Sequence, residues 1–415
     1  MPQHICAPLE AVEASITGGN LSALTELRRL AKEESLPVYL VGGPVRDVLI
    51  GMPIRDLDFV VEGDAPGLAD RLGKELGATV VRHEAFGTAS VALPDGRVDL
   101  ATARREVYPK PASLPQVTPA SIHEDLARRD FSINALALPL FDDQPRVLDL
   151  HGGVEDIRNG LVRILHANSF VDDPTRVLRA IRYEQRLSFQ IEPDTLSRLR
   201  DATGQMSLLT GDRLRHELER ILEEKHPAPV LDRAAHLGAL QGIHASLVDA
   251  GAVSRLAPGQ PVLVYLAALT YPLSSQEAEG MIQRLNMPGP WAEVVRHTGE
   301  LKRLEPELSV DNLPPSSLTG FIERFSEQAL VAVSRFSSSP LVAQRIERYL
   351  TEHRHISPIF HGQDLLDMGI PAGPLVGQVL QELRDAKLDG KVHTESDERT
   401  WVLESLARKG KSADE

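Results

Sequence analysis

The hydrophobic pattern of this chain changes near residue 150, and that change limits the fold to an α+β arrangement. Before it, short runs rich in β-branched residues alternate with helical spacing. The runs predict strands at 38–41, 56–64 and 78–93, and the spacing predicts helices at 21–35 and 66–76. These elements are typical of a mixed sheet with helices, so we expect an N-terminal head of about 150 residues built in this way.

Beyond residue 151 the pattern is that of long amphipathic helices. The spacing predicts helices at 174–187, 193–201, 212–224 and 228–238, with more to follow. We therefore expect the C-terminal two thirds to be helical. In the head, the segment 108–119 holds four prolines in twelve residues. That density argues against a helix or a central strand, so we predict an exposed loop there.

Composition excludes several classes of protein. The 415 residues suffice for about two to four domains. With 45 basic and 59 acidic side chains the net charge is −14, so any nucleic acid must bind at a local basic patch. The single cysteine, Cys6, excludes an internal disulfide and a cysteine-built metal centre. We expect a cytoplasmic protein without an export signal or a membrane span.

The stretch LVGGPVRDVLIGMPIRDLDFVVEGD, residues 40–64, carries the strongest chemical signal. On a strand, Asp56 and Asp58 face the same way and Leu57 lies buried behind them. Two adjacent carboxylates repel each other unless a cation lies between them, and Mg²⁺ prefers such oxygen ligands. Asp99, in a neighbouring strand-like run, could complete a catalytic triad of carboxylates.

The glycines of this stretch indicate an anion site beside the carboxylates. Gly42 and Gly43 would let backbone N–H groups approach a triphosphate where a helix begins, and Arg46 would add positive charge. Taken singly, an Asp-x-Asp pair is most often a solvated strand end, and a glycine pair before a helix is common. The combination at fixed spacing is what favours nucleotide chemistry.

A row of arginines marks the predicted helix at 174–187. Arg176, Arg179, Arg182 and Arg186 fall within about 120° of arc. Such a row is either a solvated face paired with acids such as Glu184 or a binding surface. Asp173 could accept the exocyclic amine of cytosine or adenine while Arg176 donates to the ring nitrogen, which would reject uracil and guanine.

Several segments, in order, resemble one family. Residues 40–64 resemble the first motif of the class II nucleotidyltransferases that build the 3′ CCA end of tRNA, relatives of the polymerase-beta-type superfamily. RRDFSINALAL, DLHGGVEDIRNGLVR and FVDDPTRVLRAIRYEQRLSF are similar to the second, third and fourth motifs, and GQDLLDMGIPAGPLVGQVLQEL to the tail module. Ser132 replaces the usual Thr, and Asp172 the usual Glu.

The resemblance implies a domain order and an activity. It implies a polymerase-beta-type catalytic head at 1–150, a helical nucleotide-selecting neck at 151–230, a helical body at 231–350 and an RNA-binding tail at 351–415. It also implies addition of C and/or A from CTP and ATP to the 3′ end of tRNA without a template. The attack of the 3′ hydroxyl would use two Mg²⁺ ions and release pyrophosphate. No obligate protein partner is expected.

The resemblance also implies roles for individual residues. Asp56, Asp58 and Asp99 would be catalytic, with Asp56 and Asp58 holding metal. Asp130 would contact the ribose hydroxyls, and Asp173 with Arg176 would form a protein template for the base. Asn134 and Asp149 would brace the site, and Arg104 would serve a phosphate or a hinge. The remaining expected nucleotide-binding residues are Gly42, Gly43, Arg46, Arg128, Arg129, Arg179 and Arg182.

Other functions stay open at this point. The chain could add CCA, only C-C or only the final A, or it could be a poly(A) polymerase. The intact segment 108–119 disfavours C-C addition, because the C-C-adding members of the family have a shortened loop there. No basic segment follows the fourth motif, which disfavours poly(A) synthesis, whereas DDPTR and YEQR resemble A-adding specialists. An inactive RNA-binding protein and a small-molecule nucleotidyltransferase are the remaining alternatives.

Overall fold

The computed structural model describes residues 8–54, 56–94, 96–142 and 145–411. Cys6, on which the redox expectation rests, lies outside these residues. The chain divides into two compact units, one made of residues 1–218 with 233–243 and the other of residues 219–232 with 244–415. The carboxylates and glycines predicted from the sequence all belong to the first unit.

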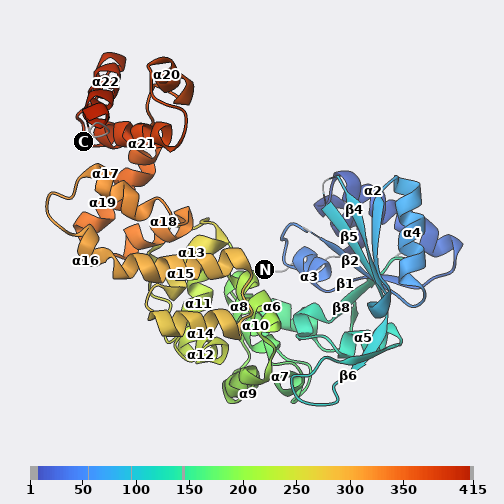
Figure 1. The fold of residues 1–415 in the computed structure, drawn as a ribbon. Helices are drawn as coiled ribbons and strands as arrows, with labels where there is room; N and C mark the ends of the chain where they lie inside the picture. The colour runs from blue at the N-terminus through green and yellow to red at the C-terminus, as the bar shows by residue number, and fades with distance from the viewer. Residues whose placement is uncertain (1–7, 55, 95, 143–144, 412–415) are drawn as a thin grey trace. The chain divides into compact units, whose positions relative to one another are not determined.

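The first unit is built on a seven-stranded sheet of order β3-β4-β5-β2-β1-β8-β9 (Figure 1). Only the pairing of β2 with β5 is parallel; the other neighbours in this sheet are antiparallel. The strands are β1 Val38–Val41, β2 Leu57–Val61, β3 Thr79–His83, β4 Thr88–Leu93, β5 Gly96–Thr102, β8 Leu136–Pro139 and β9 Leu148–Asp149. The strands expected before residue 100 are therefore confirmed.

Helices pack on the sheet through leucines at helical spacing. Leu24 and Leu27 of α2 and Leu68 and Leu72 of α4 are fully buried. Asp64 accepts the N–H of Gly67 and so caps the start of α4. The helices of the head are α1 Pro8–Ser15, α2 Gly18–Glu33, α3 Gly43–Leu49, α4 Ala65–Leu76, α5 Ile122–Ala127 and α6 Gly153–Asn159.

Side chains of β2 alternate between the two faces of the sheet. Val60 packs with Ile122 and Leu126 of α5, so this helix covers one end of its face. Asp58 points to the same face, because it lies two residues earlier in the strand, and it is exposed. The face is thus apolar beneath α5 and opens to solvent at the carboxylates.

The segment 108–119 is not wholly a loop. Residues Gln116–Pro119 form β7, which pairs antiparallel with β6, Arg104–Val107, in a separate two-stranded ribbon. Our prediction of an exposed loop was therefore wrong for its last four residues. A two-stranded ribbon has two free edges, so a proline can end one strand without breaking a hydrogen-bond ladder on both sides.

Helices dominate the rest of the chain, as expected. The four helices predicted between 174 and 238 appear as α8 Thr175–Leu187, α9 Pro193–Ala202, α10 Gly211–Leu222 and α11 Pro227–His236. A short parallel pair, β10 Leu161–Val162 and β11 Gln190–Ile191, brackets α7 Ser169–Asp172 and α8. Between residues 193 and 411 the structure contains helices and turns but no strand.

Two apolar clusters lie among the described residues of the second unit. One joins residues of α15 to α19, with Ile322, Val333 and Ile346 among the most buried. The other joins α20 to α22 around Leu365, Val379 and Leu383. The remaining helices are α12 Ala239–Ile243, α13 Val262–Thr270, α14 Ser275–Arg284, α15 Gly289–Arg303, α16 Glu305–Leu308, α17 Pro315–Ile322, α18 Glu327–Phe336, α19 Pro340–Thr351, α20 Gly362–Asp367, α21 Pro374–Leu388 and α22 Glu395–Lys411.

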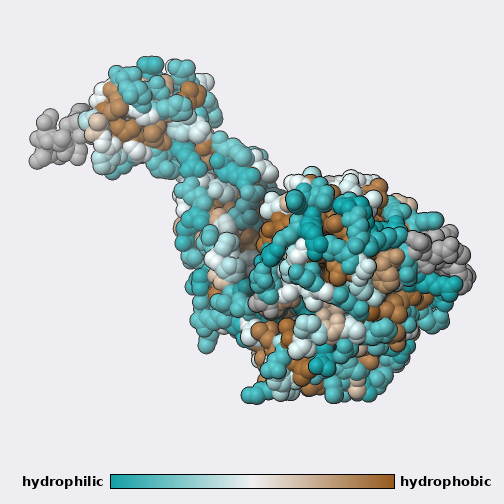
Figure 2. Space-filling view, turned by 90° about the vertical axis from the view of Figure 1, so that its right-hand side faces the viewer, coloured by the Kyte–Doolittle hydropathy of each residue, from teal (hydrophilic) through white to brown (hydrophobic). Residues whose placement is uncertain are grey.

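The molecular surface is mixed in polarity. Figure 2 shows that hydrophilic residues cover most of the visible face and that apolar residues are scattered in patches among them. In the described ranges, no helix combines the length and the apolarity that crossing a bilayer requires.

Candidate active site

Three carboxylates come together at the pairing of β2 with β5. Asp58 of β2 is in register with Asp99 of β5, and Asp56 directly precedes β2. Asp56 and Asp58 are exposed, while Leu57 between them is fully buried. Adjacent parallel strands carry in-register side chains on the same face, so the sequence correctly placed these three acids side by side.

The surroundings of Asp58 raise the pKa of its carboxyl to about 6. The largest cause is the surrounding protein, which displaces water from the carboxylate; Asp99 and then Asp56 add like-charge repulsion. Arg129 and Arg97 oppose the shift. An all-oxygen cluster that repels itself in this way fits a hard divalent cation.

Asp99 is engaged by protein groups. Its Oδ2 lies 2.8 Å from Nε of Arg97, and its Oδ1 accepts a hydrogen bond from Ser90 of β4. Within the described residues, no three acidic, histidine or cysteine side chains gather as a ready-made metal-ligand set. The acids open to a cation in this structure are therefore Asp56 and Asp58, completed by oxygens of a substrate; Asp99 could join them only when Arg97 releases it.

Gly42 makes room for an arginine. It is the N-cap residue of α3, with φ +71°, and a Cβ added there would lie 2.8 Å from Nη1 of Arg129. Only glycine combines this backbone conformation with so close an approach. Its own N–H donates to the carbonyl of Leu136 at 3.0 Å and so is already paired within the protein. Gly43 follows as the first residue of α3.

Asp125, which sequence reasoning missed, holds both arginines of the second motif. Its Oδ1 accepts from Arg128 at 2.7 Å and its Oδ2 from Arg129 at 3.0 Å, and its side chain is fully buried. Burial alone would raise the pKa of Asp125, but the two guanidinium groups lower it below its usual value. Its position three and four residues before the arginines was a helical signal for these pairs.

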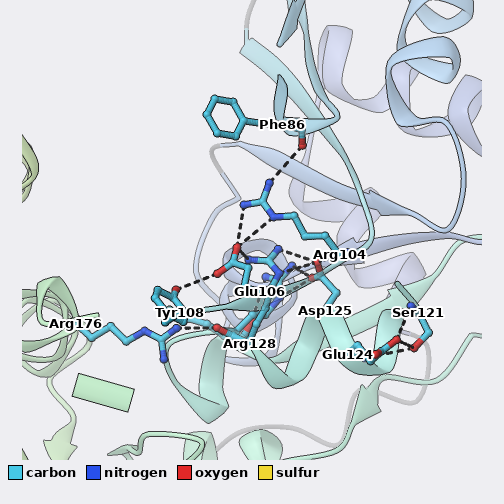
Figure 3. A network of polar contacts seen from close by, with 11 residues as sticks. Phe86, Arg104, Glu106, Tyr108, Ser121, Glu124, Asp125, Arg128 and Arg176 are labelled. Atoms are coloured by element: carbon cyan, nitrogen blue, oxygen red, sulfur yellow. Dashed lines mark hydrogen bonds and ion pairs between the residues drawn. The ribbon is translucent and has the colours of Figure 1, made fainter. Parts of the chain in front are cut away.

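The arginines continue into a second network that sequence reasoning also missed. Glu106 of β6 accepts from Arg104 at 3.2 Å, from Arg128 at 2.9 Å and from the hydroxyl of Tyr108 at 3.0 Å. Figure 3 shows Arg176 of α8 beside this cluster, and its guanidinium donates to the backbone carbonyl of Arg128. Arg104 is thus part of a polar cluster at the base of the ribbon.

A buried chain of hydrogen bonds links α3 to α8. Arg46 donates to Asn134 at 2.6 Å, Asn134 donates to Oδ1 of Asp130 at 3.1 Å, and Oδ2 of Asp130 accepts from Arg179. Arg46 is only 4% exposed and also pairs with Asp47. Arg46, which we expected to add positive charge to the anion site, is therefore held by protein groups.

The arginine row of α8 is mostly internal. Arg176 and Arg182 are 5% and 6% exposed, whereas Arg186 is exposed. Glu184, on the same helix, pairs with Arg233 of α11. Of the two interpretations left open for this row, a solvated face therefore does not describe Arg176 and Arg182. The ring of Tyr183 lies among three guanidinium groups. Its centre is 5.2 to 5.7 Å from those of Arg46, Arg179 and Arg182.

The two predicted base-reading side chains make separate contacts. Oδ1 of Asp173 accepts from Thr175 and from Arg213 of α10, the latter at 2.7 Å. Arg176 donates to Ser169 at 2.6 Å and to the carbonyl of Arg128 at 2.7 Å. Arg176 thus reaches the second motif while Asp173 pairs with α10, and the described contacts include no hydrogen bond between their side chains.

Asp149, which we expected to brace the site, holds the start of α6. Its oxygens accept the N–H groups of His151, Gly153 and Val154, which fixes the start of α6.

Comparison with known proteins gives matches along most of the chain. Residues 38–163 match the model of the poly A polymerase head domain, and residues 188–249 match that of the probable RNA and SrmB-binding site of polymerase A. A Geobacter sulfurreducens A-adding tRNA nucleotidyltransferase is 35% identical over 91% of this chain, but this chain spans only 46% of that relative.

Other relatives match from end to end. The A-adding tRNA nucleotidyltransferase of Halalkalibacterium halodurans is 30% identical, covering 97% of this chain and 96% of its own. The CC-adding enzyme of Deinococcus radiodurans is 32% identical, covering 97% and 98%.

Solved structures agree in fold. A CCA-adding enzyme in complex with ATP superposes with a TM-score of 0.77 at 30% identity, over 96% of this chain and 99% of that one. The Thermotoga maritima CCA-adding enzyme complexed with tRNA gives 0.74 at 29% identity, over 96% and 98%. With full-length relatives at 30% identity or more and the three carboxylates on adjacent strands, this chain belongs to the tRNA nucleotidyltransferase family.

Proposed function

We propose that this chain adds nucleotides from ATP and CTP to the 3′ end of tRNA without a nucleic-acid template, releasing pyrophosphate. The observation that carries the proposal is the register of Asp58 with Asp99 beside Asp56, at a site flanked by Arg129. Relatives that match end to end are named for A or CC addition to tRNA. An inactive RNA-binding protein has no use for three clustered carboxylates that repel one another.

Asp56 and Asp58 would hold divalent cations, of which Mg²⁺ is the expected one. When bound, two such ions lower the pKa of the attacking 3′ hydroxyl and neutralise the leaving pyrophosphate. Arg129 is held beside Gly42 by Asp125, and in this position its guanidinium can bind a phosphate oxygen. Arg128 is held by the same carboxylate, and its backbone carbonyl accepts a hydrogen bond from Arg176.

Base selection would use Asp173 and Arg176. In the described part of the chain, Oδ1 makes all the hydrogen bonds of the Asp173 carboxylate, which leaves Oδ2 to accept an exocyclic amine. Arg176 donates through its two terminal nitrogens and keeps further N–H donors for a ring nitrogen. Cytosine and adenine satisfy this pair, whereas uracil and guanine leave polar groups unpaired.

Asp130 would serve the nucleotide through Arg179 rather than directly. Both of its oxygens are bonded within the protein, to Asn134 and the N–H of Phe131 on one side and to Arg179 on the other. A contact to the ribose would require breaking these bonds. We therefore assign Asp130, Asn134 and Arg46 to positioning and keep Arg179 and Arg182 as the groups nearest the nucleotide.

Addition of the terminal A is the step that we propose in every case. Full CCA synthesis and A addition by a specialist both include it, and the intact segment that carries β6 and β7 disfavours C-C addition alone. A-adding relatives favour the specialist as the second candidate. The helices of the second unit would grip the tRNA through its backbone.

The test supplies tRNAs that end at the discriminator base, at C or at C-C, with one labelled nucleoside triphosphate at a time. Incorporation of C, C and then A indicates the full reaction. Incorporation of A only, onto tRNA ending in C-C, indicates the specialist. Incorporation of C but never A would contradict the proposal.

A further inference from the structure

Arg97 shares the face of the sheet that carries the three acids. Leu57 is in register with Val98 and Asp58 with Asp99, so Arg97 stands level with Asp56 on the neighbouring strand. Parallel strands are about 4.8 Å apart, and side chains two residues apart face the same way. The face thus presents a square of three carboxylates and one guanidinium.

The Arg97 side chain turns toward the carboxylates although it could extend into water. It is 58% exposed, yet its Nε lies 2.8 Å from Oδ2 of Asp99. Arg97 therefore offsets the negative charge of Asp99 directly.

Both oxygens of Asp99 have a partner in this arrangement. Arg97 pairs with Oδ2 and Ser90 donates to Oδ1. A divalent cation needs the same oxygen lone pairs, and it would also lie close to the guanidinium charge. Cation and guanidinium therefore exclude each other electrostatically at Asp99.

We propose that Arg97 is a built-in competitor of the divalent cation, a positioning residue that holds Asp99 until the cation displaces it. This inference rests on the cation site of the proposed function. Displacement frees the guanidinium from Asp99, and because the side chain is 58% exposed it can extend into solvent. Arg97 then sets the cation concentration that the enzyme needs, and it limits binding of cations without nucleotide.

The competition predicts tighter cation binding when the guanidinium is removed. An exposed ion pair contributes up to about 1 kcal/mol, so Arg97→Ala should tighten the dissociation constant about two- to five-fold. Arg97→Lys keeps the charge and should stay within about two-fold of the wild type. Arg105→Ala is the matched control, because Arg105 is 59% exposed and pairs with Glu124 outside the site.

The experiment titrates the full chain with MnCl₂ in the absence of nucleotide and RNA, and counts free Mn²⁺ by electron paramagnetic resonance. Thermal unfolding of each variant verifies folding. Tighter binding by Arg97→Ala, with Arg97→Lys and Arg105→Ala unchanged, supports the inference. Equal or weaker binding by a folded Arg97→Ala overturns it.

Asp58→Asn separates this inference from the proposed function. If it weakens Mn²⁺ binding while Arg97→Ala does not tighten it, the cation site stands and the role of Arg97 fails. If Asp58→Asn leaves binding unchanged, the cation site of the proposed function fails, and the inference fails with it.

Discussion

Arg179 donates two hydrogen bonds to one oxygen of Asp130, at 3.0 Å from Nε and 2.6 Å from Nη2. This pair joins α8 of the neck to the second motif of the head. The burial of Asp130 would raise its pKa, but Arg179, Arg176 and the amide of Asn134 lower it to about 2. The ionised carboxylate is therefore part of the folded structure.

Asp130→Asn should destabilise the protein in a pH-dependent way. Because the folded pKa lies below the ordinary 3.8, the carboxylate stabilises the fold above about pH 4, and this contribution is lost as pH falls toward 2. We expect a loss of about 2 kcal/mol at pH 7 that shrinks below pH 4. Urea unfolding of the wild type and the variant, at pH 7 and at about pH 3, measures this difference in the free energy of unfolding.

Asp70→Asn is the control for this experiment. Asp70 pairs with Arg82, but both side chains are more than 40% exposed. Solvent screens such a pair, so its removal should change stability by less than about 1 kcal/mol. A pH-independent effect of Asp130→Asn would show that its ionisation contributes nothing.

Gly42→Ala should impair both stability and nucleotide binding. The added Cβ meets Nη1 of Arg129 at 2.8 Å and also strains a backbone at φ +71°. Gly51→Ala carries the same strain, at φ +72°, with open space around the Cβ. Each should lose about 1 kcal/mol from the backbone, but only Gly42→Ala should raise the KM for ATP, by about ten-fold or more. Equal KM values would show that Arg129 does not need the space.

Arg213→Ala should loosen the segment before β7. Arg213 donates at 2.9 Å to the carbonyl of Ala112 while also holding Asp173, and the N–H of Ala112 donates to Val171. Hydrogen exchange in the peptide 108–116 should accelerate about ten-fold or more. Arg220→Ala, at an exposed pair with Glu223, should leave this exchange unchanged. Unaltered exchange in Arg213→Ala would mean that other contacts dock the segment.

Arg176→Ala should blur base choice. Without the guanidinium, the ring-nitrogen acceptor of cytosine and adenine has no donor, so the preference over uracil and guanine should fall by about ten-fold or more. Arg186→Ala, at the exposed end of the same helix, is the comparison. Competition assays with the four nucleoside triphosphates measure the preference. Selectivity equal to that of the wild type would assign base reading to other residues.

Local patterns predicted much of the head. The alternation at 56–61 was enough to place Asp56 and Asp58 on one face, because strand periodicity alone determines it. The sequence suggested that Asp99 lies on a neighbouring strand, but it could not give the register of that strand with β2. The structure pairs Asp99 with Asp58. The family resemblance supplied the order of domains and the candidate residues.

Long-range partners could not be predicted from the same patterns. The helical spacing correctly placed the arginines of α8 on one side of the helix. Their burial, however, depends on Asp130, Glu217 and Tyr183, which lie against them. Asp130 is 49 residues away from Arg179 in the sequence. Likewise, the strand at Gln116–Pro119 depends on its partner β6, which composition does not reveal.

The central claim is that the carboxylates of Asp56 and Asp58 hold the divalent cations that nucleotide transfer requires. The direct measurement is transfer of labelled AMP from ATP to a tRNA ending in C-C, by the wild type and by the double variant Asp56→Ala, Asp58→Ala, with thermal unfolding showing that both are folded. The account predicts a rate at least about a thousand-fold lower in the variant. Transfer by the variant at the wild-type rate would contradict it.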